Sequence, residues 1–154
     1  NVHPSIEPFS TFATATAPIM ICAGNDRQFR QLAITIGAPG LADDPRFTTN
    51  LDRVENRADL RSELESRLGL DSVEYWAEAL NEAGVPAGAV NDIGGGFAMA
   101  ESLGLDPVSE IEGVRTTASP IRLSASPSEK RMPPPGLDEQ GDEIRAWLRA
   151  PRED

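Results

Sequence analysis

Gly24, Asn25 and Asp26 are the residues of this sequence whose types and spacing best suit chemistry. They follow the apolar run of residues 18–23 and precede an amphipathic stretch. At such a corner, free amides at a helix N-terminus can bind an anion, and a carboxylate can take part in proton transfer. A glycine turn followed by an Asn or Asp helix cap explains the same residues without any catalytic role. The residues alone leave both interpretations open.

Other reactive side chains give weaker signals. His3 is the only histidine, so a Ser-His-Asp triad would need it as its base, in an irregular stretch near the start of the sequence. No tight group of carboxylates stands out, so we expect no metal site. Cys22 is the only cysteine, which excludes an intrachain disulfide. Because it lies in an apolar run, we predict that it is a small buried hydrophobe and not a nucleophile.

The glycine run at residues 93–98, IGGGFA, invites comparison with phosphate-binding loops, in which successive backbone amides face an anion. It has neither the GKS/T ending nor the GxGxxG spacing of those loops. We therefore predict a flexible loop, because glycine is the usual residue where the backbone takes uncommon angles.

Composition limits the classes of partner. The chain has 154 residues, a length typical of one domain or of a piece of a larger one. It carries 25 acidic against 14 Lys and Arg side chains, a net charge of −11 that repels nucleic-acid phosphates and anionic membranes. No apolar stretch approaches the ~18–20 residues that span a bilayer. We expect no nucleic-acid or membrane partner, and a cytoplasmic location.

The elements that must position the corner are predicted from the apolar pattern. Residues 18–23 indicate a buried strand, and residues 27–36 a helix that Gly37 ends. A second helix is expected over residues 51–68. A third follows a capping-box-like start at Asp71 and Glu74 and ends at Gly84.

The second part of the chain has shorter signals. A strand is predicted over residues 85–90, a helix over 97–103, and a hairpin of 108–111 with 114–123 around Gly113. Residues 124–137 are rich in proline and should lie extended, and a last helix is expected over 139–148. The order of elements predicts an α+β (α/β) fold, a short sheet packed by helices.

Eight short stretches, in this order and spacing, resemble one family. They are N-V-HP at 1–4, AGNDRQF at 23–29, LADDPRFTTN at 41–50, R-VENR at 53–57, EYW at 74–76, AGVPAGAVN at 83–91, SPIRLS at 119–124 and PPPGLDEQGDEI at 133–144. Together they resemble the C-terminal part of family III CoA-transferases, which include formyl-CoA transferase, carnitine CoA-transferase and the alpha-methylacyl-CoA racemases.

The resemblance implies a two-domain enzyme that transfers CoA between carboxylic acids. Its subunits would interlock as a homodimer, with acyl-CoA and a carboxylic acid as substrates and no metal. A Rossmann-like N-terminal half, not in this sequence, would bind CoA and carry the aspartate of the aspartyl-CoA and anhydride intermediates. Residues 1–10 would be a linker from that half, residues 11–113 the small domain, and residues 114–154 the return to the large domain. The chain alone would then be an inactive fragment.

The resemblance also gives the corner a role. In the racemase branch the aligned stretch places a carboxylate beside the catalytic base, and Asp26 best matches that position. In the transferase branch the loop would shape the acyl pocket. We therefore expect Asp26 to be catalytic, with Gly24, Asn25 and His3 contacting substrate. The racemase branch, or a non-catalytic binding or assembly module, remains an alternative.

Overall fold

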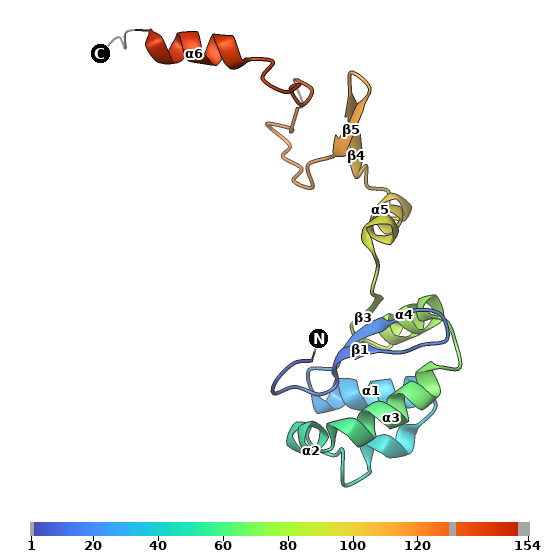
Figure 1. Cartoon of the computed structure of the whole chain (residues 1–154). Helices are drawn as coiled ribbons and strands as arrows, with labels where there is room; N and C mark the ends of the chain where they lie inside the picture. Colours follow the sequence, from blue (N-terminus) through green and yellow to red (C-terminus); the bar gives the residue numbers. More distant parts are fainter. Residues whose placement is uncertain (1, 130–131, 151–154) are drawn as a thin grey trace. The chain divides into compact units, whose positions relative to one another are not determined.

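The computed structural model describes residues 2–129 and 132–150, which form two compact units (Figure 1). Unit 1 is Asn1–Asn91 and unit 2 is Asp92–Asp154. Each unit is described by itself. The domain limits expected at residues 10 and 113 stay predictions, and the last segment's residues 151–154 lie outside the described residues.

Unit 1 is built on an antiparallel sheet with strand order β1-β2-β3. Its strands are β1 (Phe9–Phe12), β2 (Ile19–Cys22) and β3 (Ala87–Ala89). The predicted strand 18–23 is therefore the central one, as its two buried isoleucines suggest. Strand β1 was not predicted, because a four-residue FSTF stretch with a polar centre gives too short a pattern.

The helical segments that accompany this sheet are α1 (Asp26–Thr35), η1 (Pro39–Ala42), α2 (Asn50–Glu55), α3 (Arg57–Leu68) and α4 (Val73–Glu82). Their apolar faces and strands β1 and β2 supply most of one buried core. That core contains Phe12, Ile19, Ile21, Ala23, Phe29, Leu32, Ala33, Ile36, Ala42, Phe47, Leu60, Leu64, Leu68, Val73, Trp76, Leu80 and Val85. The predicted helical stripes thus bury the residues that the spacing of three and four indicates.

Two predicted helix boundaries in unit 1 are wrong. The helix expected over 51–68 is broken at Asn56, whose side-chain amide donates to the carbonyls of Arg46 and Asp52 at 3.2 and 2.9 Å. The third helix is capped by Ser72, whose hydroxyl accepts from the amide of Tyr75, and not by Asp71. In both places a short polar side chain competes for backbone groups, which spacing alone does not reveal.

Unit 2 contains α5 (Ile93–Ser102), the hairpin β4 (Val108–Ile111) and β5 (Val114–Thr117), and α6 (Gly141–Arg149). The predicted loop at 93–98 is wrong, because it is the start of α5. The carboxylate of Asp92 caps this helix by accepting from the amide of Gly95 at 2.7 Å. The second hairpin strand ends at Thr117, earlier than the expected residue 123.

The hairpin turn is made by Glu112 and Gly113, both with positive φ (49° and 80°), as a two-residue turn of this twist requires. The predicted arm, residues 124–137, has no helix or strand in its described part, and its residues 130 and 131 lie outside the described residues.

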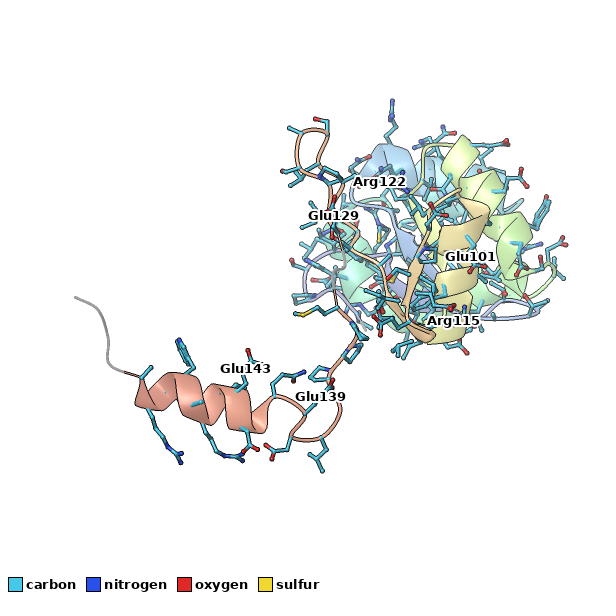
Figure 2. All side chains as sticks on the ribbon, turned by 90° about the horizontal axis from the view of Figure 1, so that it is seen from above. Glu101, Arg115, Arg122, Glu129, Glu139 and Glu143 are labelled. Atoms are coloured by element: carbon cyan, nitrogen blue, oxygen red, sulfur yellow. The ribbon has the colours of Figure 1, made fainter. Side chains whose placement is uncertain are left out.

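Within its described residues, unit 2 has no buried apolar side chain. On α6 the apolar Ile144, Trp147 and Leu148 are 52, 73 and 65% exposed. Charged side chains of all its elements, including Glu101, Arg115 and Glu143, are exposed as well (Figure 2). This unit therefore lacks a core of its own. No helix in the described part of the chain combines the length and apolarity needed to cross a membrane.

Candidate functional site

The corner after β2 is held by two hydrogen bonds that both involve Gln28. Asn25 is the N-cap of α1, with its Oδ1 accepting from the amide of Gln28 at 2.9 Å. The Gln28 side chain in turn accepts from the amide of Gly24 at 2.9 Å. Asn25 is therefore the helix cap that the structural interpretation expects, and the catalytic role of Asp26 and the substrate contacts of Gly24 and Asn25 stay predictions.

Asp26 is the first residue of α1, and its side chain forms an ion pair. Its Oδ1 accepts from Nη2 of Arg53 at 2.8 Å. The two partners differ sharply in exposure, since the Asp26 side chain is 67% exposed and that of Arg53 is 0% exposed. A buried cation therefore holds a carboxylate that faces solvent.

Arg53 uses the rest of its guanidinium to bind backbone. Its Nε donates to the carbonyl of Glu7 at 2.8 Å and its Nη1 donates to that of Phe47 at 3.0 Å. The Cζ atom lies 4.5 Å from the centroid of the Phe29 ring, a cation–π contact. All three nitrogens of this buried charge thus donate hydrogen bonds and one of its faces packs on a ring, as burial of an arginine requires.

His3 lies on the segment that precedes β1. Its ring stacks on that of Phe9, with centroids 5.1 Å apart and planes 15° from parallel. Its carbonyl accepts from Arg57 Nη2 at 2.9 Å, and its Nδ1 accepts from the amide of Ser5 at 3.2 Å. Within the described chain, His3 makes no hydrogen bond or ring contact with Gly24, Asn25 or Asp26. The structure therefore joins three of the four candidate residues and leaves His3 apart.

Glu7, on the same segment, is a buried acid that sequence reasoning missed. It is 1% exposed, and its Oε2 lies 2.8 Å from Nε of Arg57. Neither carboxylate oxygen makes a hydrogen bond of good geometry with a described residue. Burial raises the pKa of Glu7 above its usual value, although the charges of Arg57 and Arg61 oppose the shift.

The three arginines that bind the segment before and within β1 have a regular spacing in the sequence. Arg53, Arg57 and Arg61 recur every fourth residue, so they lie on one side of the α2–α3 segment. All three donate to the segment of residues 3–11, through the carbonyls of Glu7, His3 and Thr11. Four-residue spacing of arginines was thus the available signal for the polar anchoring of β1.

The raised pKa of Glu7 predicts a pH effect on stability. Since the folded state favours the protonated acid, the free energy of unfolding should fall as pH rises from the usual value near 4.5 through the raised pKa. Glu7→Gln does not titrate, so its stability relative to the parent chain should increase over this window. Urea unfolding of both chains between about pH 4.5 and about pH 7.5 measures the difference. Glu65→Gln, at a half-exposed ion pair with Arg61, is the control. A stability difference between the Glu7→Gln variant and the parent chain that is flat with pH, or slopes the other way, would contradict the prediction.

Neither Cys22 nor a group of metal-ligating side chains adds a second candidate site in the described residues. Burial raises the pKa of the Cys22 thiol, which disfavours the nucleophilic thiolate. Cys22 in β2 is half-buried, and not buried as we predicted. Among residues 2–129 and 132–150, no three His, Cys, Asp or Glu side chains are grouped so as to hold a metal ion.

Comparison with known proteins assigns the chain to a family. The model of CoA-transferase family III matches residues 1–141, nearly the whole chain. The chain belongs to CoA-transferase family III. Acetyl-CoA:oxalate CoA-transferase of Acetobacter aceti is 35% identical to it over 152 residues, which cover 98% of the chain and 39% of the relative. Succinate–glutarate CoA-transferase of Agrobacterium fabrum is 33% identical over 156 residues, covering 96% and 38%.

A solved structure confirms the family fold. A CaiB/BaiF family protein from Brucella suis matches with a TM-score of 0.81 and 36% identity, over 96% of the chain and 39% of that protein. The predicted family and the α+β fold class are therefore correct. The family III chain spans about two fifths of the length of these relatives.

Proposed function

We propose that this chain is the C-terminal part of a family III CoA-transferase that moves CoA between carboxylic acids. The observation that carries the proposal is the family match over residues 1–141, together with relatives named as CoA-transferases that cover nearly all of the chain. The other three fifths of such an enzyme would lie before residue 1 and supply the CoA site. We propose a cytoplasmic, interlocked homodimer, as the family resemblance implies.

The relatives' names suggest which acids to test first. They name oxalate, succinate and glutarate, which are all dicarboxylic acids. We infer that a short dicarboxylic acid and its CoA thioester are the substrates here. A second carboxylate on the substrate would need a donor or cation in the site, and backbone amides at a helix N-terminus such as that of α1 are suitable donors.

The proposed reaction is covalent. An aspartate of the N-terminal half attacks the acyl-CoA carbonyl, which forms a mixed anhydride and releases CoA thiolate. The thiolate then attacks the aspartyl carbonyl, giving an aspartyl-CoA thioester and the free first acid. The acceptor carboxylate repeats the two steps in reverse and leaves as the new acyl-CoA. No oxidant, reductant or metal is needed for this balance.

In this scheme Asp26 lies at the edge of the acyl pocket. Its side chain would help to orient the reacting groups, and Gly24 and Asn25 would contact substrate from the same loop. His3, which the structure leaves apart from the corner, is proposed to contact substrate from the segment before β1. Support for the role of Asp26 is its exposed carboxylate beside a buried cation.

The full-length protein should exchange CoA between a short dicarboxylyl-CoA and a free dicarboxylic acid, whereas the 154-residue chain should turn over none. Asp26→Ala in the full-length protein should lower turnover by about tenfold or more, because an oriented charge at the reacting group is lost. Its melting temperature should fall, because the buried Arg53 loses its counter-ion, although Asn25 still caps α1. Steady-state kinetics and thermal melts of the same preparations make the test.

Asp43→Ala is the matched control, because Asp43 also pairs with an arginine, Arg30, at 3.2 Å and is exposed. It should leave turnover unchanged. Unchanged turnover of Asp26→Ala with a lowered melting temperature would show that the corner is only structural. Absence of CoA exchange with any dicarboxylic acid would overturn the proposed substrate class. Activity of the 154-residue chain would overturn the proposal that the nucleophilic aspartate lies in the N-terminal half.

A further inference from the structure

We propose that Arg53 is the positioning residue of the site, fixing the Asp26 carboxylate relative to the segment that carries His3. The inference rests on the proposed role of the corner. Arg53 is the side chain in contact with both pieces: its Nη2 donates to Asp26 Oδ1 and its Nε to the Glu7 carbonyl, each at 2.8 Å. Asp26 and Glu7 are 19 positions apart in the sequence, and both bind the guanidinium of Arg53.

The guanidinium is rigid enough to position another group. It is fully buried, stacked on Phe29, and bonded by Nη1 to the Phe47 carbonyl. Its donors leave the planar group in fixed directions, unlike the rotating ammonium of lysine. An exposed carboxylate usually gains little from an ion pair because both side chains must be ordered. Here the cation is already ordered by other contacts, so Asp26 alone has to be fixed.

The arrangement also leaves part of Asp26 free for a ligand. Arg53 engages Oδ1, and within the described chain Oδ2 accepts no hydrogen bond. Arg53 thus binds one oxygen of a carboxylate whose side chain is 67% exposed. This is the geometry expected of a hydrogen-bond acceptor that is available to a substrate. If Asp26 served only to neutralise the buried Arg53, its carboxylate would not have to be exposed to solvent.

The His3 segment is fixed by the same group of contacts. Asn50 accepts from the amide of Glu7 at 3.1 Å and donates to the Ser5 carbonyl at 2.8 Å, while Arg57 binds the His3 carbonyl. Arg53 also binds this segment, through the Glu7 carbonyl. Movement of Arg53 would therefore shift both pieces of the proposed site together.

Arg61 provides a matched comparison within the same unit. It stacks on Phe12 at 4.7 Å, donates to the Thr11 carbonyl at 2.9 Å and pairs with Glu65 at 2.7 Å. These are the same kinds of contact that Arg53 makes, but none involves the corner. Because the Arg61 side chain is 35% exposed and that of Arg53 is 0% exposed, thermal melts of each variant accompany the kinetics. A loss of kcat measured where each variant is fully folded, and seen only at Arg53, follows from positioning.

The test compares Arg53→Lys, Arg61→Lys, Asp26→Ala and the Arg53→Lys/Asp26→Ala double variant in the full-length transferase. We expect Arg53→Lys to lower kcat about tenfold with KM within about threefold, because a displaced group costs rate more than binding. Arg61→Lys should keep kcat near the parent value. The loss in the double variant should be smaller than the product of the two single losses, since Arg53 acts in part through Asp26. Multiplied losses in the double variant, or equal losses at Arg53 and Arg61, would overturn the proposal.

A second pair of variants covers a failure of Arg53→Lys to fold. Phe29→Leu removes the ring beneath Arg53 and keeps its hydrogen bonds, and Phe12→Leu does the same beneath Arg61. Both rings are 1% exposed, so their stability losses should be similar. Only Phe29→Leu should lower kcat, by a few fold, and only while Asp26 is present. An inactive parent enzyme would refute the proposed function, whereas an active parent with equal effects of the two Leu variants would refute the role of Arg53 alone.

Discussion

Residues 92–154 expressed by themselves should show no cooperative unfolding transition, whereas residues 1–91 should fold and unfold cooperatively. Ordering each residue's backbone costs about 1–2 kcal/mol, which burial of apolar surface must offset. The described part of unit 1 has 17 buried apolar residues for this purpose. The described part of unit 2 has none, so its helices and hairpin lack the packing that stabilises short elements in water.

The two tryptophans allow each unit to be followed separately. Trp76 is 5% exposed in unit 1 and Trp147 is 73% exposed in unit 2. Fragment 1–91 should emit like a buried indole and shift to the red in one urea transition. Fragment 92–154 should emit like a solvated indole at every urea concentration, with weak helical circular dichroism. A cooperative transition of fragment 92–154, at a low concentration that excludes association, would be incompatible with the absence of a core.

Some of this fold could be predicted because local and tertiary preferences agree. Helix α1 is amphipathic, and the positive φ of Gly37 (74°) just beyond it is the left-handed turn that the sequence suggested. Strand β2 is a short apolar run before a turn, and it lies between β1 and β3 with Ile19 and Ile21 buried on one face. Where periodicity, cap and turn all point to one structure, the sequence is sufficient.

The failures have a common cause in polar contacts that outweigh propensity. The glycines at 94–96 cost a helix about 1 kcal/mol each relative to alanine, yet α5 includes them. The Asp92 cap offsets part of this cost by satisfying a free amide at the first turn. At Asn56 the balance is opposite, because side-chain hydrogen bonds to two carbonyls interrupt a stretch with continuous helical periodicity.

In the candidate site, too, some residues could be predicted from the sequence and others could not. Gly24, Asn25 and Asp26 could be found from sequence because a corner after a strand is a local feature. Arg53 could not, because its partners Glu7 and Phe47 come from other parts of the chain and its full burial is a tertiary property. A charged side chain is almost never fully buried unless it is paired, so periodicity places arginine on the surface by default. The structure reverses that expectation at this position.

Arg53→Met should be among the most destabilising single substitutions in unit 1, lowering the free energy of unfolding by about 3–5 kcal/mol. It leaves the carbonyls of Glu7 and Phe47 without their donor, at about 1–3 kcal/mol for each buried group. It also removes a cation whose charge helps to keep the pKa of Glu7 from rising further. The methionine recovers part of this loss by packing on Phe29.

Arg30→Met tests whether that loss is specific to burial. Arg30 pairs with Asp43 at 3.2 Å, but their side chains are 55 and 74% exposed, so removal of this pair should cost about 0–1 kcal/mol. Urea unfolding of the 154-residue chain, followed by Trp76 fluorescence in a Trp147→Phe background, compares the two variants directly. A loss of about 3 kcal/mol or more is a large share of the about 5–15 kcal/mol that stabilises a typical domain, so the midpoint should fall sharply only for Arg53→Met. Equal midpoints for the two variants would mean that Arg53 contributes no more than a surface ion pair, and the buried network would then have no energetic role in holding Asp26.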